Sequence, residues 1–147
     1  MTTSIENKLE KTIDQLGYAG LLPFAGLAAL LWVVKADLLP FVAVALTGYT
    51  AVIVSFLGGI HWGIGFLRAP RAPRFHFVLG VVPSLLAWLA LLMPAYAALP
   101  LLGLVLVMCY AVDRKTYPAA GLSRWLPLRL RLTVVATLSC VLGAAAI

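Results

Sequence analysis

The sequence predicts an all-α integral membrane protein, a bundle of five transmembrane helices with its N-terminus in the cytoplasm and its C-terminus outside. Apolar residues make up 63% of its 147 residues and charged residues 11%, against about 45–50% and about 25% in soluble domains. The apolar residues form long runs that end at charged residues, and the cations gather in alternate connecting segments. A soluble fold of this length could not bury so much hydrocarbon.

The apolar runs define the helices, because a helix needs roughly 20 apolar residues to cross the bilayer. The first run stops at Lys35, the second and longest at Arg68, the third at Pro94 and the fourth at Asp113, while the fifth continues to the end of the chain. The predicted helices cover residues 16–34, 39–67, 75–93, 97–112 and 126–147. Residues 1–15 are expected to form a cytoplasmic interfacial tail, and the whole chain one domain.

The fifth helix is the weakest prediction, because Arg129 and Arg131 interrupt its beginning. Long arginine side chains can extend to the lipid headgroups, so both guanidiniums are expected at the interface. A bundle of four crossings, with the last segment re-entrant or lying in the interface, is the alternative. A β-barrel is excluded, because its strands alternate polar and apolar residues and residues 78–92 form an unbroken apolar run.

The cations determine the predicted orientation. Ten of the eleven lie in the N-terminal tail, in the second loop and in the fourth loop with the start of the fifth helix. Cytoplasmic segments carry the excess of lysine and arginine, so these three segments are placed in the cytoplasm. The same distribution argues against nucleic acid as a partner, because phosphate binding needs several cations on one exposed face.

The second helix contains an unusual run of small residues, and we expect it at the packed centre of the bundle. Gly59 and Gly63 form a GxxxG pattern that Ser55 extends at four-residue spacing, and such stripes let two helix backbones approach closely. Gly58 and Gly65 flank His61 on another side of the same helix. The stripe would also permit a homo-oligomer.

His61 is the strongest candidate for a functional residue, followed by the adjacent Trp62. It lies seven residues inside Arg68, or roughly 10 Å below the headgroups at ~1.5 Å per residue. An ionisable group at that depth usually faces a partner or a cavity. The topology gathers candidate partners into the same half of the bilayer, namely Arg68, His76, Tyr110 and Asp113. Either a structural hydrogen bond between helices or a ligand or proton site would account for His61.

Several kinds of chemistry have no support in the sequence. The two histidines lack a third ligand at the spacing of a zinc site, and no nucleophile elbow, phosphate-binding loop or HExxH motif is present. Cys109 and Cys140 lie inside apolar runs, in no redox or haem-attachment spacing, and are interpreted as small buried hydrophobes. We therefore expect no metal and no cofactor, and the chemistry argues against an enzyme.

The chain resembles the transmembrane protein 69-like family, small membrane proteins that are classed as domain of unknown function 3429. The resemblance covers nearly the whole chain, and its most specific part is Gly-Gly-Ile-His-Trp-Gly at residues 58–63. The residues that open the first helix, 16–24, and Asp113 also match the family. The resemblance implies a bundle of membrane helices, and it transfers no activity and no catalytic residue. For a bacterial chain, the expected location is the inner membrane.

Three functions remain open from the sequence. The first is a non-enzymatic bundle, either an accessory to a larger membrane assembly or a binder of a small ligand. The second is a small-molecule or proton-linked transporter that uses His61, with Asp113 and Tyr110 as relays. The third is a redox protein in which His61 contacts haem or a quinone.

Overall fold

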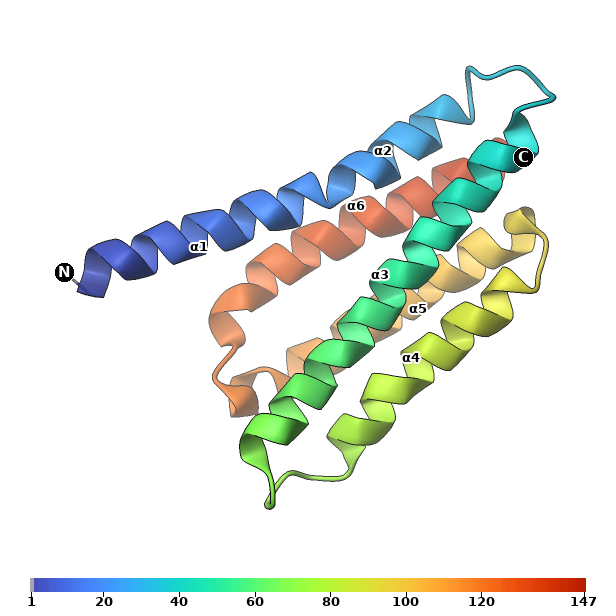
Figure 1. Cartoon of the computed structure of the whole chain (residues 1–147). Helices are drawn as coiled ribbons and strands as arrows, with labels where there is room; N and C mark the ends of the chain where they lie inside the picture. The colour runs from blue at the N-terminus through green and yellow to red at the C-terminus, as the bar shows by residue number, and fades with distance from the viewer. Residues whose placement is uncertain (1) are drawn as a thin grey trace.

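The chain is almost entirely helical (Figure 1). The structure, a computed structural model, describes residues 2–147. Its helices are α1 (Thr2–Ala19), α2 (Leu21–Leu30), α3 (Leu39–Arg68), α4 (Phe75–Leu91), α5 (Ala95–Thr116) and α6 (Leu126–Ala145), with the 3-10 turns η1 (Pro118–Ala120) and η2 (Ser123–Trp125) before α6. These residues contain no strand, so the predicted all-α class is confirmed.

Four helical stretches of the described chain are long and apolar enough to cross a membrane, namely Ser4–Leu30, Leu39–Arg68, Ala95–Thr116 and Ser123–Ala145. α4 is also apolar but has only 17 residues. At ~1.5 Å per residue it is roughly 25 Å long, at the lower limit for a span. Four or five helices of this chain are therefore suited to the bilayer.

The N-terminal segment differs from the predicted tail and first helix. The tail is not a separate element, because α1 runs from Thr2 through residue 15 and ends at Ala19. The break falls at Gly20, and α2 then ends at Leu30 rather than at residue 34. Pro23 explains the position of the break, because it has no N–H to donate to the carbonyl of Ala19. The first turns of α1 project beyond the other helices (Figure 1).

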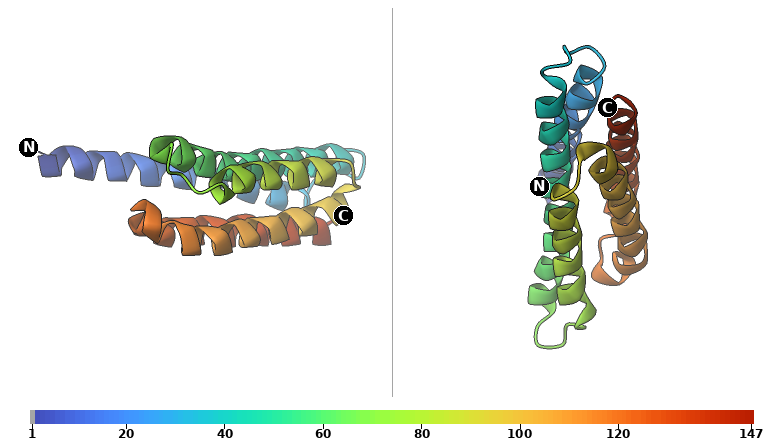
Figure 2. Two further views of the ribbon diagram at one scale, coloured as in Figure 1. Left: turned by 90° about the horizontal axis from the view of Figure 1, so that it is seen from below. Right: turned by 90° about the vertical axis from the view of Figure 1, so that its right-hand side faces the viewer.

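The helices form two layers, with α3 and α4 in one and α5 and α6 in the other (Figure 2). α2 packs against α6 and α3. Fully buried aliphatic side chains fill the space between the layers, among them Leu46, Val54, Leu99, Leu102 and Leu106. The connection between α3 and α4 and the one between α5 and α6 lie at one end of the bundle, which we call the cation-rich end, and the C-terminus lies at the opposite end (Figure 1).

Glycines do bring α3 close to a neighbour, but on a different face from the predicted GxxxG stripe. A Cβ added to Gly58 would lie 2.6 Å from the carbonyl oxygen of Gly80 in α4, and one added to Gly65 would lie 2.8 Å from the Phe77 ring. A Cβ on Gly59 or Gly63 would meet no atom within 4 Å. The face of α3 that meets α4 is therefore the one that carries His61, and packing through the GxxxG stripe stays a prediction.

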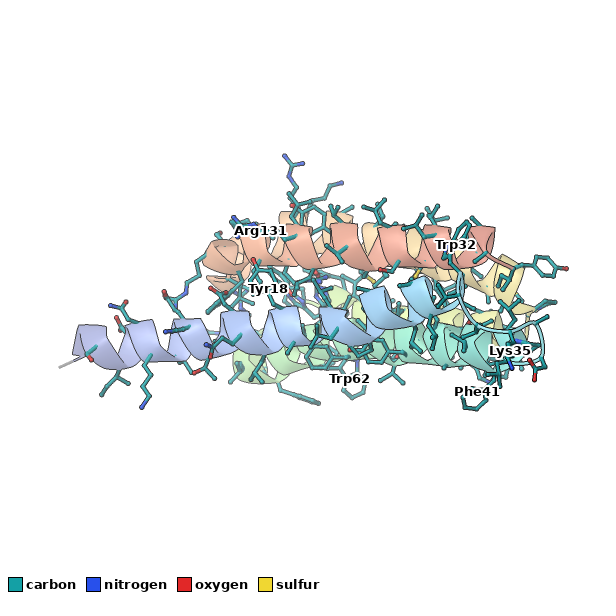
Figure 3. The ribbon with its side chains drawn as sticks, turned by 90° about the horizontal axis from the view of Figure 1, so that it is seen from above. Tyr18, Trp32, Lys35, Phe41, Trp62 and Arg131 are labelled. Carbon is teal, nitrogen blue, oxygen red and sulfur yellow. The ribbon has the colours of Figure 1, made fainter. Side chains whose placement is uncertain are left out.

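Trp62 also links α3 to α4, on the outer side of the two helices. Its indole N–H donates to the carbonyl of Phe77 at 2.8 Å, and its ring occupies the place where a side chain on Gly80 would project, 1.7 Å from Cδ1. The ring is 39% exposed, on the outer side of α3 (Figure 3). Trp62 is therefore a structural link between α3 and α4, placed beside His61 in sequence but pointing away from it.

Candidate functional site

Close packing of α3 on α4 brings the two histidines of the chain together. His61 is 4% exposed and His76, in the first turn of α4, is 2% exposed. Their Nδ1 atoms lie 3.3 Å apart, and the rings stack with centroids 5.6 Å apart. A side chain on Gly58 or Gly65 would push α4 away, so these glycines make the contact between the imidazoles possible.

Asp113 of α5 joins the histidines to the second layer. Its Oδ1 lies 3.0 Å from Nε2 of His61, and the carboxylate is 2% exposed. A carboxylate in a bundle of apolar helices is costly unless it is paired. The imidazole supplies part of that pairing from α3.

Arg129 of α6 supplies the counter-charge, which the sequence interpretation did not anticipate. Its Nε donates to Oδ2 of Asp113 at 2.9 Å and its terminal nitrogen Nη2 to the same oxygen at 2.5 Å. The residue is 9% exposed, so it does not extend to the headgroups as predicted. The prediction was wrong because it treated Arg129 as a lone charge, whereas a buried carboxylate within reach makes the inward orientation favourable.

We call these four residues, His61, His76, Asp113 and Arg129, the polar cluster. They come from α3, α4, α5 and α6, so the cluster ties together four helices of both layers. One carboxylate faces one guanidinium, which leaves no charge of the pair unbalanced. Such a cluster can hold the bundle in one arrangement, and it can also present charge and protons to a ligand.

When both imidazoles are neutral, one assignment of donors and acceptors satisfies the hydrogen bonds between His76, His61 and Asp113. A neutral imidazole donates from one nitrogen and accepts at the other. If His61 donates Nε2–H to Asp113, its Nδ1 must accept, so His76 donates from Nδ1. The resulting chain runs from His76 through His61 to the carboxylate, across three helices.

Tyr117, just after α5, borders the cluster and is not among the partners that the sequence predicted for His61. It is 3% exposed, and its ring centroid lies 6.4 Å from that of His61. Burial, and then the negative charge of Asp113, raises the pKa of Tyr117 to about 12. Its phenol is therefore neutral at physiological pH and keeps its O–H, which lies close to Asp113 and Arg129.

Two residues expected beside His61 are not part of the cluster. Arg68 donates instead to the carbonyl of Ala119, which ties the end of α3 to the loop before α6. Tyr110 is half-buried, and no hydrogen bond joins it to the cluster within residues 2–147. These residues also contain no group of three or more histidine, cysteine or acidic side chains that could hold a metal ion.

Hollows reach the cluster from two sides. A small one of about 80 Å³ touches His61 and Asp113 between α3, α4 and α5. On the other side, hollows of about 160 and 480 Å³ share five lining residues, so together they form one elongated depression between α1, α3 and α6. We call it the apolar groove; the shared residues are Leu16, Gly17, Phe56, Arg129 and Leu132.

Fold and site together define a helical membrane protein with a buried ion pair and two histidines inside its bundle. The chain belongs to the family described as "Protein of unknown function (DUF3429)", whose model matches residues 9–145. This confirms the resemblance found in the sequence.

A curated relative is similar over most of the chain. Transmembrane protein 69 of Xenopus tropicalis is 41% identical over 133 residues, which is 86% of this chain and 51% of the relative. The chain thus spans about half the length of that relative. No solved structure matches the chain.

Proposed function

We propose that this protein is a non-enzymatic membrane bundle that binds a small lipophilic ligand beside the polar cluster. One observation carries the proposal: Arg129 belongs to the cluster and also lines both hollows of the apolar groove. Ligand sites are typically apolar hollows of about 300–1,000 Å³ with a few converging polar groups. The larger hollow, about 480 Å³, lies within that range, and the guanidinium supplies the polar group.

Filling the groove should remove the ligand. Leu16 lines both hollows and is 68% exposed, whereas Leu22 is 72% exposed and lines no part of the groove. We expect native mass spectrometry of the protein, released from gentle detergent, to detect a bound lipophilic mass. Leu16→Trp should lose that mass and the matched control Leu22→Trp should keep it. Repeated recovery of a ligand-free wild-type chain from native membranes would contradict the proposal.

The row of hydrogen-bonded side chains from His76 through His61 to Asp113 favours a second candidate function, proton-linked transport. A proton that arrives at His76 could pass through the shared Nδ1 contact to His61 and on toward Asp113. In proteoliposomes with a trapped pH indicator, His61→Ala is then expected to abolish proton flux while the protein remains folded. Unchanged flux together with lost thermal stability would instead assign His61 a structural role.

The redox alternative has weaker support. The two Nδ1 atoms lie 3.3 Å apart, whereas two imidazoles that ligate one metal from opposite sides, at about 2.0 Å each, would need a wider separation. The histidines in this arrangement do not fit a bis-histidine haem. A quinone contact at His61 remains a version of the ligand proposal, and bound-lipid mass spectrometry would identify it.

The role of accessory in a larger assembly is a further proposal, supported by the small extramembrane mass of the chain. Gentle detergent purification should then recover a reproducible protein partner or a homo-oligomer. For a bacterial chain we propose the inner membrane as the location, with the cation-rich end in the cytoplasm.

A further inference from the structure

The lining of the apolar groove shows what part of a ligand it could hold. Apart from Arg129, Thr133 and Tyr117, its walls are apolar or glycine side chains from α1, α2, α3, α5, α6 and the loop before α6. Leu16 and Phe56, at its rim, are 68% and 65% exposed, so the groove opens on the lipid-facing surface. In a bilayer such a surface is solvated by hydrocarbon, and an alkyl chain is its natural occupant.

The polar end of the groove offers donors and no carboxylate. Among the described residues, Arg129 is the charged residue that lines the two hollows of the groove. Asp113 lines the separate hollow of about 80 Å³ between α3, α4 and α5. A guanidinium carries five N–H donors, and its two bonds to Asp113 leave others. The phenol of Tyr117 is a second donor in the larger hollow. A ligand head at this end must therefore accept hydrogen bonds.

Thr133, one turn after Arg129, adds an independent observation. It lines the smaller hollow of the groove and is 4% exposed. Its Oγ1 is the buried side-chain polar atom that lacks a partner in the described part of the chain. Thr47, Thr50 and Ser139 lie in similar apolar helices, and each donates to the carbonyl four residues earlier. The unused hydroxyl of Thr133 is a third donor beside the guanidinium.

The two hollows are arranged along the helices. The larger one begins at the cation-rich end, where Tyr117, Leu122 and Trp125 line it. The smaller one continues to Phe24, Leu106 and Ala136, near the middle of α2, α5 and α6. A head near Tyr117 and Arg129 would therefore send its tail toward the centre of the bilayer, in the orientation of a lipid of the same leaflet.

We propose that the apolar groove binds a single-chain amphiphile with a carboxylate head, such as a long-chain fatty acid. Its carboxylate accepts hydrogen bonds from Arg129 and Tyr117, and its alkyl tail runs past Leu132 toward Phe24. This assignment rests on the proposed function and names the ligand class for it. The converging donors support a carboxylate, which accepts several hydrogen bonds at once. Asp113 occupies Nε and Nη2 of Arg129, which leaves N–H groups on the other edge of the guanidinium, and the hydroxyl of Thr133 has no partner in the described part of the chain. A single alkyl chain suits a depression that runs along the helices from Tyr117 to Phe24.

The test is equilibrium binding of radiolabelled palmitate to the full-length protein in nanodiscs, with empty nanodiscs as the background. Wild type and Leu22→Trp should bind above background, and Leu16→Trp should bind about tenfold more weakly, a loss of about 1.4 kcal/mol. Methyl palmitate should compete at least about tenfold less well than palmitate, because hydrogen bonds to charged groups contribute more than neutral ones. Tyr117→Phe, which keeps the ring, should weaken binding several-fold.

Three results would overturn the assignment. Equal competition by palmitate and its methyl ester would exclude the carboxylate, and equal binding by Leu16→Trp and Leu22→Trp would exclude the groove. A diacyl phospholipid that co-purifies and is not displaced by palmitate would exclude the single chain. After the first or the third result, a bound lipophilic mass that Leu16→Trp loses would still support the proposed function. Equal binding by Leu16→Trp and Leu22→Trp, or absence of any bound mass, would remove the proposed function as well.

Discussion

Asp113→Asn is expected to destabilise the folded bundle by about 3–5 kcal/mol, because it leaves a buried arginine without its counter-charge. Arg129 is 9% exposed, and both of the hydrogen bonds that its side chain makes within residues 2–147 go to this carboxylate. His61 loses its charged acceptor in the same change. Unfolding in detergent, followed by tryptophan fluorescence during a denaturant titration, measures the loss.

A double variant separates the charge effect from simple loss of packing. The large cost arises when one charge of a buried pair is left without the other, so Asp113→Asn with Arg129→Met, which removes both charges, should recover much of the stability. Glu10→Gln is the control, since Glu10 pairs with Arg124 in an exposed salt bridge that contributes about 0–1 kcal/mol. A double variant less stable than Asp113→Asn alone would show that the guanidinium does not depend on Asp113.

Gly58→Ala is expected to destabilise the protein by about 1–3 kcal/mol, the usual cost of overfilling a packed interface. The new Cβ would lie 2.6 Å from the backbone oxygen of Gly80, and a backbone cannot turn aside as a side chain can. α4 must therefore move away from α3 and separate His76 from His61. Thermal unfolding in detergent measures the effect.

The adjacent residue provides a matched control. Gly59→Ala adds the same methyl group where no atom lies within 4 Å, and alanine favours helix over glycine by up to about 1 kcal/mol. Gly59→Ala should thus be neutral or slightly stabilising. If Gly59→Ala proved the more harmful change, the GxxxG face would be the packed one, in this chain or in an oligomer.

Three residues of the polar cluster could be predicted from the sequence, because the depth of a residue along a helix depends only on its position in the chain. Counting from Arg68 places His61 inside the membrane, and the alternation of helices puts His76 and Asp113 in the same half of the bilayer. Counting does not give the direction in which a side chain points. Tyr110 was selected together with Asp113, three residues away, yet only Asp113 contacts His61.

The direction in which charged side chains point is a property of the assembled bundle. Arg129 and Arg131 read alike in the sequence, and both were expected at the headgroups. In the structure Arg129 binds Asp113, while Arg131 donates to Tyr18 of α1 on the exposed side (Figure 3). A rotation of α6 decides between the two outcomes, and it depends on side chains of three other helices.

The sequence alone determined the all-helical membrane class, because whether an apolar run is long enough to cross the bilayer depends only on residues that are neighbours in the chain. It also determined the family, through the motif at residues 58–63. Tertiary packing decided which face of α3 meets α4, that Arg129 turns inward, and that Tyr117 is buried. Those outcomes follow from the rotation of each helix about its axis, which is set by complementary side chains far apart in the chain.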